Sequence, residues 1–183
     1  MEINEEIVKE YFTAVEKCFI LENVIYRVET KREGKKKGGG WSDIDLLAYK
    51  PAYKSETDQI LDIEVKYREK APFHQGSDKA SNLDKVIDNF KSVARSQRIA
   101  EYNPKTLEIR KIFVTNKKAF TETTRNKFEI LLKDQGIELL YIEEVFSKLQ
   151  NFFRENPNKM TSVIGQVLRI INNQEIMPNK RHQ

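Results

Sequence analysis

Two short segments of this chain carry acidic and basic side chains at a spacing that could bring them together. SDIDLLAY spans residues 42–49 and ILDIEVKY spans residues 60–67. In both segments apolar and polar residues alternate with the period of two that is typical of a β-strand. Asp45, Glu64 and Lys66 therefore lie on the polar faces of two predicted strands. If these strands are neighbours, two carboxylates and one ammonium group converge on one place.

Two carboxylates beside a lysine are suited to metal-dependent hydrolysis of a phosphodiester. Mg²⁺ prefers oxygen ligands, commonly carboxylates together with water and substrate phosphate. Asp45 and Glu64 would supply carboxylate oxygens, and the backbone carbonyl of Val65 a further one. Lys66 would orient the attacking water or stabilise the negative charge that develops at phosphorus. Each motif alone is common on solvated strand faces, so the prediction depends on their joint occurrence on consecutive strands.

The composition fits one domain and excludes several other kinds of site. The chain has 183 residues and a formal net charge of +4, which permits a polyanionic partner without requiring one. With Cys18 as the only cysteine and with two histidines, a disulfide framework, a cysteine-based zinc site and a histidine-rich metal site are excluded. No apolar stretch approaches the roughly 20 residues of a membrane span. The acidic N-terminus is unlike a signal peptide, so we expect a cytoplasmic protein with no membrane partner.

The rest of the pattern predicts helices and strands in mixed order, which indicates an α/β fold whose mixed sheet is flanked by helices on both faces. We expect one domain over residues 1–145, a C-terminal helical extension at 146–175 packed on it, and a disordered tail at 176–183. The predicted helices cover residues 4–21, 79–101, 121–134, 143–154 and 160–172. The predicted strands cover residues 24–29, 42–49, 60–67, 108–116 and 137–143.

A basic, glycine-rich segment directly precedes the first acidic strand. KREGKKKGGG spans residues 31–40 and is predicted to be a loop or the tip of a hairpin. Lys35, Lys36 and Lys37 would contact the phosphate backbone of a nucleic acid, independently of base sequence and with a strong dependence on salt. The alternative is a hairpin tip that serves only solubility.

Two further features near the predicted site have two interpretations each. Trp41, which follows the glycines, either stacks on a base or sugar or lies in the core or at its rim. Lys91, Arg95 and Arg98 share one stripe of the predicted helix over 79–101. This stripe either extends the phosphate-binding track or is an ordinary solvated helix face, which is the interpretation we favour.

The two acidic segments together resemble the PD-(D/E)xK nuclease superfamily. SDIDLLA at residues 42–48 and IEVKYR at residues 63–68 are most similar to Mrr-type restriction endonucleases and archaeal Holliday-junction resolvases. The resemblance covers residues 4–116 and leaves the C-terminal third of the chain without a recognisable motif. It implies a restriction-endonuclease-like αβββαβ core followed by extra C-terminal helices, and dependence on Mg²⁺ or Mn²⁺.

The resemblance also implies roles for individual residues. Asp45 and Glu64 correspond to the two metal ligands, and Lys66 corresponds to the catalytic lysine. The sequence departs from the superfamily pattern in one place, because Ile44 stands where a proline gives the motif its name. Asp43 competes with Asp45 for the ligand role. We favour Asp45, because the hydrophobic run follows it directly, as in the family pattern.

Two assignments outside the central motif also come from the resemblance. Related nucleases often add a glutamate from the first helix, and Glu10 is the preferred catalytic candidate here because of its distance from the first strand. Glu6, one helical turn earlier on the same face, is the alternative. Arg68 corresponds to the arginine that follows the lysine motif in the related proteins and would contact phosphate.

The sequence therefore predicts a metal-dependent endodeoxyribonuclease that uses water as the nucleophile. Two alternatives stay open, namely a non-catalytic nucleic-acid-binding or assembly module with the same fold, and an RNA nuclease. The expected partner is DNA, with RNA as the second candidate. A homodimer is also expected, because cutting both strands with one small site usually takes two copies. The sequence shows no separate domain for recognising a DNA sequence, so a partner subunit is a further candidate source of sequence specificity.

Overall fold

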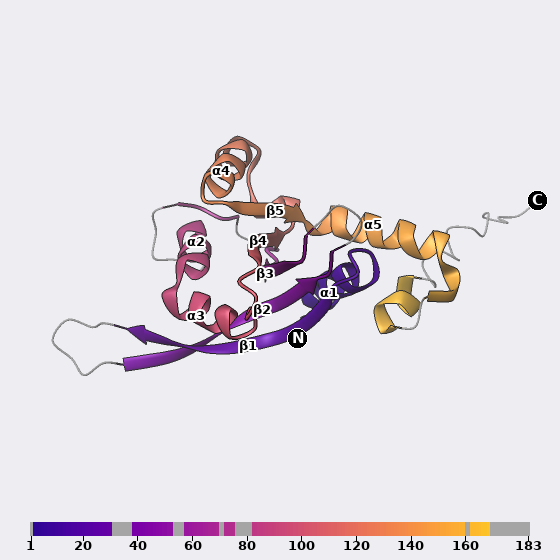
Figure 1. Cartoon of the computed structure of the whole chain (residues 1–183). Helices are drawn as coiled ribbons and strands as arrows, with labels where there is room; N and C mark the ends of the chain where they lie inside the picture. Colours follow the sequence, from indigo (N-terminus) through magenta and orange to yellow (C-terminus); the bar gives the residue numbers. More distant parts are fainter. Residues whose placement is uncertain are drawn as a thin grey trace, which may run out of the picture.

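The protein is built on one five-stranded mixed sheet with the strand order β1-β2-β3-β4-β5 (Figure 1). The computed structural model describes residues 2–30, 38–52, 57–69, 72–75, 82–159 and 162–168. The strands are β1 (Phe19–Thr30), β2 (Gly38–Lys50), β3 (Gln59–Lys66), β4 (Glu108–Thr115) and β5 (Ile137–Tyr141). The first three strands form an antiparallel meander, whereas β4 and β5 run parallel to β3. The predicted α/β class with a mixed sheet is confirmed.

Helices cover both faces of this sheet, as the sequence predicts (Figure 1). The helices are α1 (Ile3–Ala14), α2 (Leu83–Lys91), α3 (Val93–Glu101), α4 (Glu122–Asp134) and α5 (Ile142–Glu155), with short 3₁₀ turns η1 (Lys117–Ala119) and η2 (Pro157–Lys159). Residues 163–168 are also helical. α1 and α5 pack on one face, and α2 and α4 pack on the other. α3 packs against the β1–β2 hairpin through Ile99.

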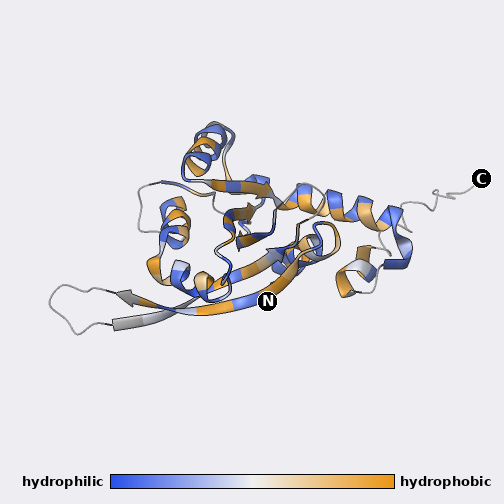
Figure 2. Ribbon diagram, viewed as in Figure 1, coloured by the Kyte–Doolittle hydropathy of each residue, from blue (hydrophilic) through white to orange (hydrophobic). Residues whose placement is uncertain are grey.

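The core follows the alternation of apolar and polar residues along these elements. On the α1 side, Leu61, Ile63 and Val65 of β3 pack with Val8 and Phe12 of α1. Figure 2 shows the matching pattern on α5, where hydrophobic and hydrophilic residues alternate along the helix. Because β3 is covered on both faces, the acidic residues Asp62 and Glu64 on its other face are buried as well.

The first helix and the long central helix differ from their predicted bounds. The predicted helix over 4–21 ends at Ala14, because the chain from Phe19 onward pairs with β2 along the whole length of β1. The predicted helix over 79–101 is interrupted at Ser92, whose backbone is extended and whose side chain caps α3 by accepting a hydrogen bond from the Arg95 backbone N–H. Long-range strand pairing and a local cap thus override the helical periodicity.

The C-terminal part of the chain packs on α1. Leu149 and Phe153 of α5 form a small core with Leu168, and Ile7 and Ala14 of α1 pack against it. The predicted disordered tail at 176–183 lies outside the described residues. Among the residues that the structure describes, no helix is long and apolar enough to cross a membrane.

The β1–β2 hairpin projects beyond the rest of the sheet (Figure 1). β1 and β2 pair from Phe19↔Tyr49 to Thr30↔Gly38, whereas β2 pairs with β3 only from Leu46↔Ile63 to Lys50↔Gln59. The hairpin residues beyond the Leu46↔Ile63 pair therefore form an arm with no strand on its β3 side. Asp45 lies where this arm leaves the sheet.

Candidate active site

The candidate site begins where β2 and β3 separate. The hydrogen-bonded ladder between the two strands ends at Leu46↔Ile63. One residue further along, Asp45 Oδ2 accepts a hydrogen bond from the Val65 backbone N–H at 2.6 Å. The carboxylate thus takes the place of the strand carbonyl that would otherwise accept this N–H. Asp45 is held between the strands and is only 6 % exposed.

Lys66 connects the two carboxylates that the sequence singled out. Its Nζ lies 3.4 Å from Asp45 Oδ2 and 3.2 Å from Glu64 Oε1. Both acids are buried, whereas the Lys66 side chain is 39 % exposed, so the cluster reaches solvent along the lysine. The structure therefore brings Asp45, Glu64 and Lys66 together, and their catalytic roles stay predictions.

A buried arginine completes the cluster from the helical side. Arg95, in the first turn of α3, donates from Nη1 to Glu64 Oε2 at 2.8 Å and from Nη2 to Asp62 Oδ1 at 2.6 Å. Its Nε lies 3.1 Å and 3.2 Å from the two Asp62 oxygens. Arg95 is 1 % exposed, so placing it on a solvated helix face is wrong. The interruption at Ser92 starts α3 in an orientation that points Arg95 at the sheet.

Lys91 and Arg98, the other two members of the predicted basic stripe, differ from Arg95 because they lie at the surface. Lys91 is exposed at the end of α2. Arg98 is paired with Glu101 one turn later on α3, and its guanidinium lies 5.1 Å from the centre of the Tyr102 ring. The stripe is therefore divided between a buried structural cation and two surface cations.

The charges of the cluster are not balanced. Three buried carboxylates, those of Asp45, Asp62 and Glu64, face two cations, Lys66 and Arg95. Burying a charge is costly unless it is paired and hydrogen-bonded. The excess negative charge is the property expected of a site that receives a further cation.

The excess of negative charge in the cluster affects the pKa of the Asp45 carboxyl. Burial, followed by repulsion from Glu64, raises the pKa of the Asp45 carboxyl to about 7, although Lys66 opposes the rise. Burial alone would lower the pKa of the Lys66 ammonium, but attraction to Glu64 and Asp45 raises it above its ordinary value. Lys66 therefore stays charged, whereas Asp45 is close to its titration point at neutral pH.

The second acidic residue of β3 has a different environment. Burial raises the pKa of the Asp62 carboxyl, and the charge and hydrogen bonds of Arg95 oppose this rise. Attraction to Asp62 and Glu64 in turn raises the pKa of Arg95 despite its burial. Asp62 and Arg95 form a closed ion pair inside the protein, and Asp62 is a residue of the cluster that the sequence analysis did not select.

The residues predicted to hold Mg²⁺ surround the Lys66 ammonium group. Asp45 Oδ2 and Glu64 Oε1 flank Lys66 Nζ. The Val65 carbonyl leaves β3 at the same edge as the Val65 N–H that reaches Asp45. Mg²⁺ commonly takes one or two carboxylates and keeps several waters. In the described part of the chain no group of three or more His, Cys, Asp or Glu side chains could hold a metal, and the metal-binding role of Asp45, Glu64 and the Val65 carbonyl stays a prediction.

The glutamates of α1 lie in different electrostatic environments. The charge of Glu5 contributes to raising the pKa of Asp45, so Glu5 is the α1 carboxylate linked to the site. Glu6 lies 3.8 Å from Lys9 Nζ. The charge of Glu10, the predicted catalytic glutamate, contributes to raising the pKa of the same lysine. The catalytic role of Glu10 stays a prediction, and the Glu5 carboxylate caps α1 by accepting a hydrogen bond from the Glu2 backbone N–H at 3.2 Å.

The segment after β3 is fixed to the end of β4. Thr115 Oγ1 donates to the Lys66 carbonyl at 2.6 Å. The Arg68 N–H donates to Asn116 Oδ1 at 2.8 Å, and Asn116 Nδ2 donates to the Arg68 carbonyl at 2.9 Å. The Arg68 guanidinium lies 4.8 Å from the centre of the Phe73 ring. These bonds fix the backbone that directly follows Lys66.

Of the remaining predicted contacts with nucleic acid, Trp41 lies on the hairpin arm. Lys35, Lys36 and Lys37 lie outside the described residues. Trp41 is 76 % exposed, so the interpretation that it is a core residue is wrong. The indole lies on the surface of the arm, four residues before Asp45.

Comparisons with known proteins identify no relative of this chain. No protein-family description matches the sequence, no curated protein matches it, and no solved structure matches the fold. The geometry of the site and the resemblance of its two motif strands are therefore the observations that bear on function.

Proposed function

We propose that this chain is a metal-dependent endodeoxyribonuclease with a restriction-endonuclease-like core. The observation that carries the proposal is the meeting of Asp45, Glu64 and Lys66 where β2 separates from β3. Two buried carboxylates with excess negative charge and a partly exposed lysine are the groups that phosphodiester hydrolysis requires. The order of α1, β1 to β3, the α2–α3 pair and β4 also agrees with the αβββαβ order of such a core.

The residues of the chain would divide the work of hydrolysis. Asp45, Glu64 and the Val65 carbonyl would hold Mg²⁺ or Mn²⁺, which would polarise the phosphate and acidify a water molecule. Lys66 would move from the carboxylates toward the phosphate, orient the attacking water and stabilise the negative charge at phosphorus. Arg95 would act as a positioning residue, because its bond to Oε2 fixes the Glu64 carboxylate while Oε1 contacts Lys66 Nζ at 3.2 Å and accepts from Asn89 Nδ2 at 3.5 Å.

A non-catalytic nucleic-acid-binding module is the second candidate. The observation that favours it is that Lys66 and Arg95 already satisfy Glu64 without a metal, at 3.2 Å and 2.8 Å. In such a module the ion pairs would only hold β2, β3 and α3 together. Excess carboxylate charge facing phosphate would weaken binding, which is the argument against this candidate.

The proposal is tested by cleavage of supercoiled plasmid and branched DNA in Mg²⁺ or Mn²⁺. We expect the wild type to cut at least one of these substrates, and Glu64→Ala and Lys66→Ala to lose the activity. Asp43→Ala and Lys105→Ala are the matched controls, because both side chains are exposed and make none of the described contacts of the cluster. An RNA of the same sequence distinguishes a ribonuclease. Cleavage that persists in Glu64→Ala would contradict the proposed site.

A further inference from the structure

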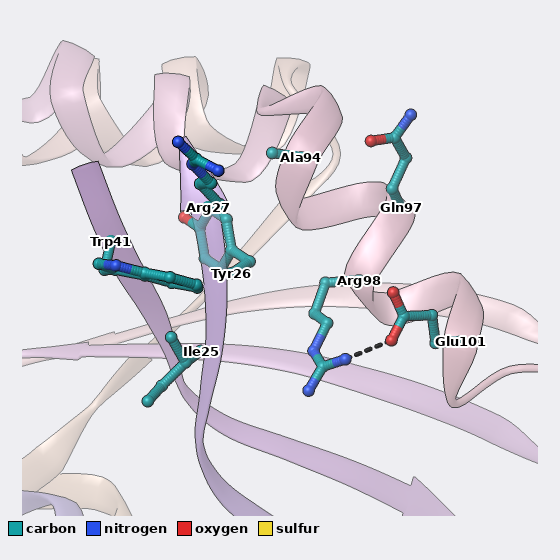
Figure 3. A pocket seen from close by; sticks show the side chains of 8 residues that line it. All are labelled: Ile25, Tyr26, Arg27, Trp41, Ala94, Gln97, Arg98 and Glu101. Carbon is teal, nitrogen blue, oxygen red and sulfur yellow. Dashed lines mark hydrogen bonds and ion pairs between the residues drawn. The ribbon is translucent and has the colours of Figure 1, made fainter. Parts of the chain in front are cut away.

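A groove runs between α3 and the hairpin arm. It encloses about 420 Å³, and Trp41 and Ile25 lie on one side of it, opposite the paired side chains of Arg98 and Glu101 (Figure 3). The volume lies within the range of sites for small organic ligands. Gln97 lies on the α3 side of the groove.

The apolar side of the groove is unusual for its exposure. Trp41 is 76 % exposed and Ile25 is 54 % exposed. Trp41 is paired directly with Arg27 across the β1–β2 ladder, so regular strand pairing holds the backbone on both sides. An exposed indole on a rigid strand offers a flat surface for an aromatic ligand at little cost in conformational entropy.

The polar groups of the groove suit an anionic ligand with hydrogen-bonding edges. Arg27 is exposed and makes no ion pair within the described part of the chain. The charge of Arg98 is balanced by Glu101, which leaves Arg27 as the cation directed to a ligand. The Gln97 amide offers both a donor and an acceptor. An indole, an arginine and an amide are suited to a nucleotide.

The groove continues toward the candidate active site. A second hollow of about 490 Å³ shares Arg27, Ala94 and Gln97 with the first and extends to Ser92 at the start of α3. The same end of α3 carries Arg95, which contacts Glu64. A nucleic-acid strand lying along α3 would therefore reach from the exposed indole toward the carboxylates.

We propose that this groove binds an unpaired nucleotide next to the scissile phosphate, with its base stacked on Trp41 and a phosphate on Arg27. This inference depends on the proposed function and specifies its substrate class. In the interior of a duplex both faces of each base are already stacked, so away from the ends a base can stack on an indole only when it is unpaired. The preferred substrate is thus nucleic acid with an overhang, flap or junction rather than continuous duplex.

The test measures binding in EDTA, where cleavage does not interfere. Fluorescence anisotropy compares a labelled duplex that carries a 5′ overhang with a blunt duplex of equal length. Trp41 is the only tryptophan of the chain, so its intrinsic fluorescence reports stacking directly. We expect the overhang DNA to bind more tightly than the blunt duplex and to quench Trp41.

Variants separate stacking from general affinity. Trp41→Ala is expected to weaken binding of the overhang DNA by about tenfold or more, because one base–aromatic stack is worth roughly 1–3 kcal/mol. Trp41→Phe should keep most of the affinity. Phe19→Ala is the matched control, since Phe19 is a 70 % exposed aromatic at the opposite end of β1, and it should bind like the wild type.

The outcomes distinguish this inference from the proposed nuclease activity. If Trp41→Ala binds overhang and blunt DNA as the wild type does, or if the wild type binds neither, the groove proposal is wrong. Cleavage of plasmid by the wild type would still support the nuclease in that case. Conversely, quenching and overhang preference without cleavage in any metal would support the groove and contradict the nuclease.

Discussion

Two buried aspartates on adjacent strands, Asp62 and Asp45, meet their cations in different ways. Asp62 is bound by Arg95 through three short contacts, and both side chains are 1 % exposed. Asp45 faces Lys66 over one contact of 3.4 Å, and the lysine is 39 % exposed. The Asp62–Arg95 pair is closed, because neither side chain reaches solvent, so another cation cannot replace Arg95. The second pair is open, so its ammonium group can give way to a metal ion.

The comparison predicts the largest effect for the closed pair. Arg95→Ala leaves Asp62 and Glu64 buried without their main cation, and we expect a loss of about 3–5 kcal/mol in the free energy of unfolding. Urea denaturation measures this loss. Lys66→Ala is the control and should lose less than about 1 kcal/mol, because its pair is partly exposed. Similar losses in both variants would contradict the distinction between closed and open pairs.

The open pair predicts an effect on rate instead of stability. Lys66→Met keeps the length of the side chain and removes its charge, and we expect cleavage to fall by about 10²- to 10³-fold. Single-turnover cleavage at saturating Mn²⁺ measures this change. Lys105→Met, in an exposed turn, should cut like the wild type. The metal-linked rise in melting temperature should persist in Lys66→Met, because the ammonium competes with the ion.

Metal binding at the open pair predicts a smaller stabilisation. At a free Mn²⁺ concentration ten times its Kd, binding should stabilise the folded protein by about 1.4 kcal/mol. Thermal unfolding with and without EDTA measures the shift. Asp45→Ala should abolish it and Asp43→Ala should keep it. The reverse result would assign the ligand role to Asp43.

The raised pKa of Asp45 predicts a pH-dependent effect on the stability of the metal-free protein. The folded pKa is about 7 and the ordinary value is 3.8, so the folded state binds the proton more tightly. Ionisation of Asp45 therefore costs no stability below about pH 4, destabilises increasingly between pH 4 and 7, and has its full effect above pH 7. In EDTA, the Asp45→Asn variant should be more stable than the wild type at pH 8 and as stable as the wild type at pH 4. A wild type more stable than Asp45→Asn at pH 8 would show that Lys66 dominates.

Much of the fold and the centre of the site could be predicted from local patterns. The observed bounds lie within two residues of the predicted bounds for β3, β4, β5, α4 and α5. In these elements apolar residues recur every two positions in strands and every 3.6 positions in helices, because one face of each element is buried. Glu5 also had a signal that was missed. It lies three residues before Val8 and seven before Phe12, on the buried face of α1.

The sequence by itself determined that Glu64 and Lys66 share one face of a strand, because successive side chains of a strand point to opposite faces. Around Asp45 this alternation is interrupted, since Ile44 packs in a different core cluster from Leu46 and Ala48. Only the tertiary structure decided the role of Arg95 and the groove beside Trp41. Arg95 meets Asp62 across 33 residues of sequence, and its direction depends on the break at Ser92. Such contacts follow from how α3 packs against the sheet, which no local periodicity encodes.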